Sequence, residues 1–186
     1  MNILNKKKIT NKAFFLDRDG VINHEIGYIK DWKKIKFYKN TIKALKKIQE
    51  KNFLIIIITN QSIIARKIAN RKQINHLHDC LKNYFYKNGI KISDIYLCPH
   101  HPEFNKRCIC RKPNNGLILK AKKKYNIDMS KSWFVGDKTS DIKAGKKSGL
   151  KTILVKSGYG GLDQNYKVKP NYIFKDLYET ACKLKY

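Results

Sequence analysis

Short apolar runs alternate along the chain with segments whose apolar residues recur every three or four positions. The apolar runs cover residues 13–16, 53–58, 133–135 and 152–155, with shorter ones at 95–97 and 172–174. Helical periodicity covers residues 40–50, 74–87, 117–125, 142–148 and 177–184. Uninterrupted apolar runs are typical of parallel strands that are buried on both faces. Their alternation with helices predicts an α/β fold with a mainly parallel sheet.

The chain is long enough for one domain with a substantial core. It has 186 residues, 42% of them hydrophobic, and we expect a single domain over residues 1–186. No apolar run approaches the roughly 20 residues of a membrane-spanning helix, so we expect no membrane partner. Residues 1–12 are polar and lysine-rich, and the apolar run that follows is too short for a signal peptide. We therefore expect a cytoplasmic protein and, by default, a monomer.

The basic composition admits two interpretations. The formal net charge is +27, and clustered lysines and arginines would indicate a nucleic-acid-binding protein. The lysines are scattered over the whole chain, however, and asparagine and isoleucine are abundant too. We favour a drift toward these three residue types, as an AT-rich coding sequence produces, and expect no specific nucleic-acid partner. A basic nucleic-acid-binding protein with a zinc module is kept as the alternative of another class.

Polar residues with catalytic potential follow the apolar runs. Asp17 and Asp19 come after the first run, Thr59 after the second and Asp137 after the run at 133–135. Open parallel sheets bind ligands at the carboxyl ends of their strands. Each residue alone is explained equally well by a turn or a helix cap. Together with Lys112, they supply the nucleophile, acid, hydroxyl, metal carboxylate and cation of a phosphoryl-transfer site.

A loop rich in cysteine predicts a metal site of a different kind. Cys98, His100, Cys108 and Cys110 bring three thiols and one imidazole into a short segment. Such a set closes a tetrahedral zinc site and leaves no open position, so the zinc is expected to be structural. On chemistry alone His101 competes with His100. The odd count of five cysteines argues against a framework of disulfides.

The polar motifs follow one another along the chain in an order that is specific to one family. They run Leu16–Asn23, Gly27–Tyr28, Thr59–Ser62, Ile64–Arg66, Cys98–Pro102 and Cys108–Pro113, followed by Gly136-Asp137 and Asp141. In these segments the chain resembles the haloacid dehalogenase (HAD) superfamily. Within that superfamily it resembles the D-glycero-D-manno-heptose 1,7-bisphosphate 7-phosphatase family. The resemblance covers roughly residues 13–160. It implies a Rossmann-like three-layer sandwich of HAD type, with no large cap domain and a zinc-binding loop at about residues 98–110.

The resemblance also implies an activity. It is the removal of the 7-phosphate of the sugar bisphosphate through an aspartyl-phosphate, within ADP-heptose and lipopolysaccharide core biosynthesis. Asp17 is the implied nucleophile and Asp19 the acid and base, while Thr59 and Lys112 hold the phosphoryl group. The implied magnesium ligands are Asp17, the Asp19 main-chain carbonyl and Asp137; the implied zinc ligands are Cys98, His100, Cys108 and Cys110. The implied substrate contacts are Arg18, Glu25, Ile26, Gly27, Tyr28, Asn60, Gln61, Ser62, Arg111 and Lys138.

The sequence leaves the substrate and the roles of a few residues undecided. Histidinol-phosphate phosphatase shares the catalytic motifs and the zinc loop, although Ser62 and the segment 64–66 favour the heptose family. Arg66 is expected at the surface, and Asp141 either orients Lys138 or the metal waters or simply begins a helix. Ile63 and Lys67 stand where the family commonly has glycine, which predicts a local change of backbone that affects substrate fit more than chemistry.

Overall fold

The computed structural model describes residues 10–105 and 107–184 and contains one six-stranded sheet. Its strands are β1 (Ala13–Leu16), β2 (Leu54–Asn60), β3 (Ile92–Cys98), β4 (Trp133–Gly136), β5 (Lys151–Val155) and β6 (Tyr172–Phe174). Their order across the sheet is β3-β2-β1-β4-β5-β6, and every adjacent pair is parallel. The predicted α/β class with a parallel sheet is confirmed.

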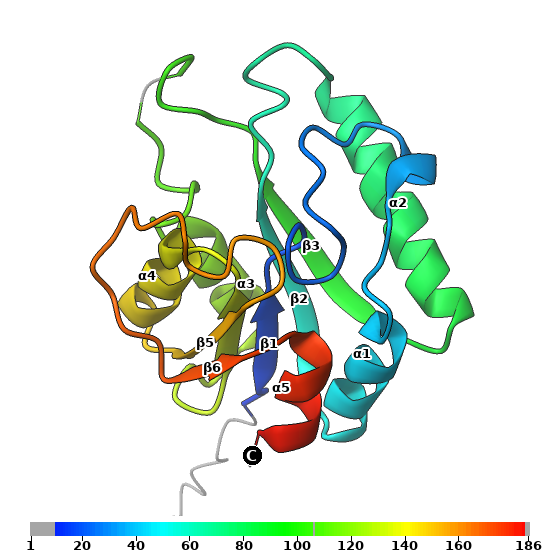
Figure 1. Cartoon of the computed structure of the whole chain (residues 1–186), viewed down its shortest axis with the longest axis vertical. Helices are drawn as coiled ribbons and strands as arrows, with labels where there is room; N and C mark the ends of the chain where they lie inside the picture. The colour runs from blue at the N-terminus through cyan, green and yellow to red at the C-terminus, as the bar shows by residue number, and fades with distance from the viewer. Residues whose placement is uncertain (1–9, 106, 185–186) are drawn as a thin grey trace, which may run out of the picture.

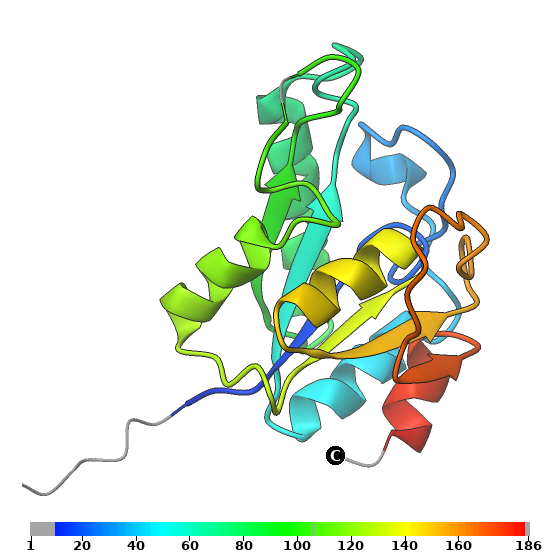
Figure 2. The same cartoon turned by 90° about the vertical axis from the view of Figure 1, so that its left-hand side faces the viewer.

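Helices cover both faces of the sheet, which gives three layers (Figures 1 and 2). They are α1 (Thr41–Glu50), α2 (Arg71–Lys87), α3 (Gly116–Tyr125), α4 (Thr139–Lys147) and α5 (Leu177–Lys183). Side chains of α1, α2 and α5 share one buried cluster with Phe14 and Leu16 of β1. Side chains of α3 and α4 share another with Phe15, which points to the opposite face because side chains alternate along a strand. This is the Rossmann-like sandwich that the family resemblance implies.

The register of the central strands brings the candidate site residues together. Leu16 is paired with Ile57 of β2 and with Val135 of β4, so β1 and β4 end at nearly the same level and β2 continues for three more residues. The residues that follow these pairs therefore emerge at one edge of the sheet. Between β1 and α1 the only helix of the described chain is the short 3-10 helix η1 (Trp32–Lys34), accompanied by isolated β-bridges, in agreement with the expected lack of a cap domain.

Three elements extend further than the apolar pattern indicates. Thr59 and Asn60 belong to β2 rather than following it, because they pair with Leu97 and Cys98 of β3. β3 begins at Ile92, where polar residues interrupt the apolar pattern. α4 begins at Thr139 instead of Ile142, because its first turn is polar and carries no periodic apolar signal. Asp141 consequently lies inside the first turn of a helix.

None of the helices in residues 10–105 and 107–184 is long and apolar enough to cross a membrane. The N-terminal segment that we expect to lack a signal peptide is, up to residue 9, outside the described residues. The expectation of one domain over residues 1–186 stays a prediction.

Candidate active site

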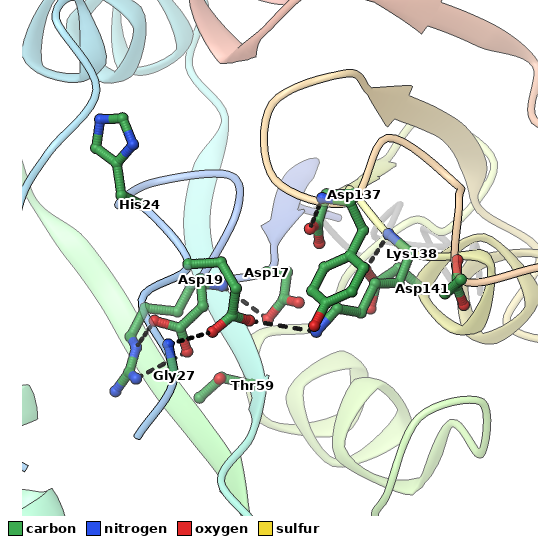
Figure 3. Close-up of polar contacts among 12 residues, drawn as sticks. Asp17, Asp19, His24, Gly27, Thr59, Asp137, Lys138 and Asp141 are labelled. Carbon is green, nitrogen blue, oxygen red and sulfur yellow. Dashed lines mark hydrogen bonds and ion pairs between the residues drawn. The ribbon is translucent and has the colours of Figure 1, made fainter. Parts of the chain in front are cut away.

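Three buried carboxylates converge at the carboxyl ends of β1 and β4. Asp17, Asp137 and Asp141 each have an oxygen within 4.8 Å of the others (Figure 3). Burial raises the pKa of Asp17 to about 6; Lys112 opposes this shift and the Asp141 charge adds to it. Burial also raises the pKa of Asp137 to about 8, and the charges of Asp141 and Asp17 add to the effect. Such a cluster is costly without a cation that shares its oxygens.

Lys112 is the internal cation of this cluster. Its Nζ lies 2.9 Å from an oxygen of Asp17 and 2.8 Å from one of Asp141, and it donates to the Ile58 carbonyl at 2.8 Å. The Asn60 side chain holds the Lys112 backbone at both its N–H and its C=O. Burial opposes the charge of Lys112, but the two carboxylates outweigh it and raise the pKa of the amine. Lys112 therefore lies beside Asp17, and its expected role in holding the phosphoryl group stays a prediction.

Asp19 lies on the other side of Asp17 from Asp137 and Asp141 (Figure 3). Both of its oxygens accept hydrogen bonds from the Arg18 guanidinium, at 3.0 and 2.8 Å. Asn23 donates to one oxygen at 2.8 Å, and Gln61 donates to the other at 3.0 Å. Burial would raise the pKa of Asp19, but Arg18 and these donors outweigh it and lower the pKa. The Asp19 side chain is therefore separate from the carboxylate cluster, and its main-chain carbonyl as a metal ligand stays a prediction.

A cleft of about 620 Å³ opens over these groups. It gathers most of the sequence-predicted site residues: Asp17, Asp19, Glu25, Gly27, Tyr28, Thr59, Asn60, Gln61, Ser62, Arg111, Lys112 and Lys138. Two of the predicted substrate contacts are not among the described residues that line the cleft. They are Arg18, which is 1% exposed, and Ile26, which is half exposed at 49%. Asp137 lies beneath the lining and is fully buried.

The loop between β5 and β6 contributes residues that the sequence analysis did not single out. Tyr159, Asp163, Asn165 and Tyr166 line the cleft. The ring of Tyr159 lies 4.1 Å from Lys138 Nζ, which also pairs with Glu25 at 3.3 Å. Asp163 accepts hydrogen bonds from the Thr139 backbone and hydroxyl. The glycines around Tyr159, just beyond a strand end, were the available signal, because glycine-rich loops at that edge often approach ligands.

Arg66 is more constrained than a solvated surface residue. Its guanidinium lies over the Phe104 ring at 4.8 Å and the Tyr28 ring at 5.8 Å, and it pairs with Glu103 at 3.3 Å. It thereby joins three loops at the rim of the cleft. His101, the competing zinc ligand, lies in this group and contacts Glu103 at 3.7 Å.

The two positions at which the family commonly has glycine behave differently. Ile63 is buried and packs against Ile74 and Ala69, so its side chain fills a small apolar cluster. Lys67 adopts φ of 57°, the left-handed conformation that glycine adopts without strain. Lys67 thus adopts a conformation that glycine would also adopt, and the expected local change of backbone stays a prediction.

The acidic cluster fits a hard cation. Asp137 Oδ1 is buried and has no hydrogen-bond partner among the described residues. Gly20 and Gly158 pack against the same carboxylate with positive φ, and a Cβ at either would collide with it. Oxygen-only donors with little room around them suit magnesium, which uses few carboxylates and keeps several waters. Asp17, Asp137 and Asp141 are the residues placed to hold it.

The raised carboxyl pKa values predict that magnesium binding is coupled to pH. Because the folded pKa of Asp137 is about 8, well above its unfolded value, its contribution to stability is lost as pH rises toward 8. Magnesium binding requires the ionised form, so it releases protons near pH 7. We expect added magnesium to raise Tm more at pH 8.5 than at pH 6, and to release about one proton per chain in calorimetry. A magnesium-induced shift that is equal at both pH values, and equal in Asp137→Asn, would contradict this coupling.

The four predicted zinc ligands also converge. Cys110 Sγ lies 3.0 Å from Cys98 Sγ and 3.4 Å from Cys108 Sγ, and 3.2 Å from His100 Nδ1. These four side chains form one cluster of possible metal ligands, and His100 rather than His101 belongs to it. Cys98 ends β3, and Arg111 Nη1 donates to the His100 carbonyl at 2.9 Å. The cluster is thus attached at one end to the sheet and at the other to Arg111 and Lys112.

Comparison with known proteins agrees with this arrangement. Residues 109–180 match the HAD-hydrolase-like family model. A D-glycero-alpha-D-manno-heptose-1,7-bisphosphate 7-phosphatase of Photorhabdus laumondii is 46% identical over 154 residues, 80% of this chain and 84% of the relative. The beta-heptose counterpart of Pasteurella multocida is 37% identical over 171 residues, 89% and 92% of the two chains.

The solved structures give the same result. The D,D-heptose 1,7-bisphosphate phosphatase of B. bronchiseptica, complexed with magnesium and phosphate, superimposes with a TM-score of 0.84. It is 27% identical, and the match covers 92% of this chain and 97% of that chain. The fold and the site thus define a phosphoric monoester hydrolase of the HAD type. Within that class, the chain belongs to the D-glycero-D-manno-heptose 1,7-bisphosphate 7-phosphatase family.

Proposed function

We propose that this enzyme removes the 7-phosphate of D-glycero-D-manno-heptose 1,7-bisphosphate, with Asp17 as the nucleophile. The observation that carries the proposal is the position of Asp17, at the floor of the cleft and paired with Lys112 at 2.9 Å. Relatives at 37–46% identity carry the corresponding name, which favours this substrate over histidinol phosphate or a nucleic acid.

The proposed reaction has two steps. An Asp17 oxygen attacks phosphorus, the bond to the sugar oxygen breaks, and Asp19 gives its proton to that oxygen. Asp19 then takes a proton from water, which attacks phosphorus and releases Asp17 and inorganic phosphate. A phosphoryl group beside Asp19 disfavours the ionised carboxylate and so supports its role as an acid. Magnesium, when bound, neutralises the repulsion between the anionic nucleophile and the anionic substrate.

The phosphoryl group is held by the chain's own donors. Thr59 and Lys112 line the cleft next to Asp17, and Gln61 Nε2 donates to the Thr59 hydroxyl at 2.8 Å. Preorganised donors of this kind stabilise the charge that develops in the transition state. Arg111 and Lys138 are cations elsewhere on the lining of the cleft. We propose that they bind the second phosphate of the bisphosphate.

The wider setting is part of the proposal. We infer that the product feeds nucleotide-activated heptose synthesis for the lipopolysaccharide core. The expected cytoplasmic location and monomeric state stay predictions, as does the lack of a specific nucleic-acid partner.

We further propose that Cys98, His100, Cys108 and Cys110 hold a structural zinc ion. Zinc folds a segment that has little apolar core of its own, and here it would fix the position of Arg111 and Lys112. The purified protein should contain about one zinc per chain, and Cys108→Ser should lose it. Turnover should fall by about 10²-fold, because small displacements of catalytic groups have effects of that size.

Metal analysis and steady-state kinetics check the zinc proposal together. Cys182→Ser is the matched control, because Cys182 is exposed and lies outside the cluster. A Cys108→Ser variant that loses zinc but keeps full turnover would contradict the role of the zinc in positioning the cations.

Phosphate release tests the proposed substrate. Heptose 1,7-bisphosphate in both anomeric forms, histidinol phosphate and a 3′-phosphorylated oligonucleotide are compared with magnesium, and Asp17→Asn serves as the blank. A strong preference for heptose bisphosphate supports the proposal. Preference for histidinol phosphate would keep the mechanism and change the substrate, whereas no release from any of them would reject the proposed substrates.

A further inference from the structure

A buried arginine lies directly behind the proposed acid. Arg18 is 1% exposed, and its Nε and Nη2 donate to the two oxygens of Asp19 at 3.0 and 2.8 Å. Its backbone N–H donates to Asp17 Oδ1 at 2.7 Å. The same residue therefore contacts both carboxylates of the proposed reaction. A bidentate guanidinium fixes the plane of a carboxylate as well as its position.

The remaining arm of the guanidinium is held by a histidine from a distant helix. Arg18 Nη1 lies 3.1 Å from His78 Nε2, and His78 is buried on the inner face of α2. Arginine has donors only, so His78 Nε2 must be the acceptor and the imidazole must be neutral. Burial, with the Arg18 charge adding to it, lowers the pKa of His78 to about 3, in agreement with the neutral form.

His78 is rigidly placed. Leu77 and Leu81 on the same helix are buried, and Asn70 and Gln73 form a capping box at its N-terminus. A capped, well-packed helix holds its side chains in fixed positions more firmly than a loop does. The chain of contacts therefore runs from α2 through His78 and Arg18 to Asp19.

We propose that His78 is a positioning residue for catalysis: through Arg18 it holds the Asp19 carboxylate in the orientation needed for proton transfer. The inference rests on the proposed role of Asp19 as the acid, and it gives Arg18 a positioning role in place of a substrate contact. Without an acceptor at position 78, the guanidinium can turn toward other partners, and Asp19 loses its fixed plane.

The choice of leaving group separates positioning from a general structural role. A sugar alkoxide leaves slowly unless it is protonated, whereas p-nitrophenolate leaves readily without an acid. The ratio kcat/KM reports events up to the transfer of phosphorus to Asp17. A defect in the orientation of Asp19 must therefore lower kcat/KM for the alkyl phosphate more than for p-nitrophenyl phosphate. A general disturbance of the cleft lowers both alike.

The experiment measures kcat/KM for p-nitrophenyl phosphate and for whichever of heptose 1,7-bisphosphate and histidinol phosphate the wild type prefers. Glutamine can place an acceptor where His78 Nε2 stands, and asparagine, equally polar, is too short to do so. We expect His78→Asn to lower kcat/KM for the alkyl phosphate by about 10-fold or more, and for p-nitrophenyl phosphate by less than about 3-fold. His78→Gln should restore most of the loss. His76→Leu, an exposed histidine on the same helix, should change neither.

Asp19→Asn separates a failure of this inference from a failure of the proposed function. If Asp19→Asn loses the alkyl phosphate selectively but His78→Asn loses both substrates equally or neither, the inference is overturned and the function stands. If Asp19→Asn shows no selectivity, Asp19 is not the acid, and both the inference and the proposed acid role of Asp19 are overturned, while phosphate release from the heptose bisphosphate still tests the substrate independently. Recovery in His78→Gln, which carries the same amide group as His78→Asn, is the result that a purely structural role would not give.

Discussion

Asp17→Asn is expected to lower turnover by about 10⁴-fold or more, because an amide oxygen cannot attack phosphorus and form a stable acyl phosphate. The substitution keeps the shape of the side chain and its acceptor for Lys112, which lies 2.9 Å away. It also removes one of three clustered carboxylates. Since burial penalises the charge of Asp17 and raises its pKa to about 6, we expect Tm at pH 8 to be unchanged or higher.

Steady-state phosphate release and thermal unfolding together check this expectation. Asp79→Asn is the control, because Asp79 is exposed on α2 and the substitution should change neither quantity. Turnover that persists in Asp17→Asn at more than about a hundredth of the wild-type rate would show that another group is the nucleophile.

Lys112→Met should impair both activity and stability. It removes the cation between Asp17 and Asp141 and leaves two buried carboxylates without it. Loss of one partner of a buried ion pair commonly costs about 3–5 kcal/mol in the free energy of unfolding. Turnover should fall by about 10²–10³-fold, because a donor to the transferring phosphoryl group is lost as well.

The stability loss in Lys112→Met should depend on pH with a definite sign. Lys112 opposes the raised pKa of Asp17, so its removal moves that folded pKa further above the unfolded value. A group with a raised folded pKa contributes to the stability of the folded protein at low pH, and this contribution is lost as pH rises through the folded pKa. The difference between variant and wild type should therefore be larger at pH 8 than at pH 5.

Denaturant unfolding at the two pH values measures this difference. Lys123→Met, an exposed lysine of α3, is the matched control and should be neutral at both. An equal loss at pH 5 and pH 8 would show that lost packing, and not the two carboxylates, accounts for the effect.

Much of the fold follows from local patterns. The runs at 13–16, 53–58 and 133–135 are apolar throughout, and such runs are typical of strands in a sheet covered on both faces. The boundaries of helices and strands could not be predicted from the apolar pattern where an element begins or ends with polar residues. The start of α4 at Thr139 is an example, because its first turn is stabilised by Asp163, a partner distant in sequence.

The site was predictable where a motif brings its residues together within a few positions. Asp17, Asp19 and the cysteine loop are of this kind. The hydrogen bond from Arg18 to His78 joins residues 60 positions apart, and the contact of Lys138 with the Tyr159 ring depends on how two loops fold over one cleft. Such pairs carry no local signal, because tertiary packing alone decides which side chains meet.

The most direct test follows the two phosphates of one substrate. Heptose 1,7-bisphosphate carries a primary phosphate ester at C7 and an anomeric phosphate at C1, which ³¹P NMR resolves. With enzyme and magnesium, the C7 signal should disappear as inorganic phosphate grows in equal amount, while the anomeric signal remains, and Asp17→Asn should leave both unchanged. Loss of the anomeric signal first, or of either signal in the Asp17→Asn sample, would contradict a 7-phosphatase that acts through Asp17.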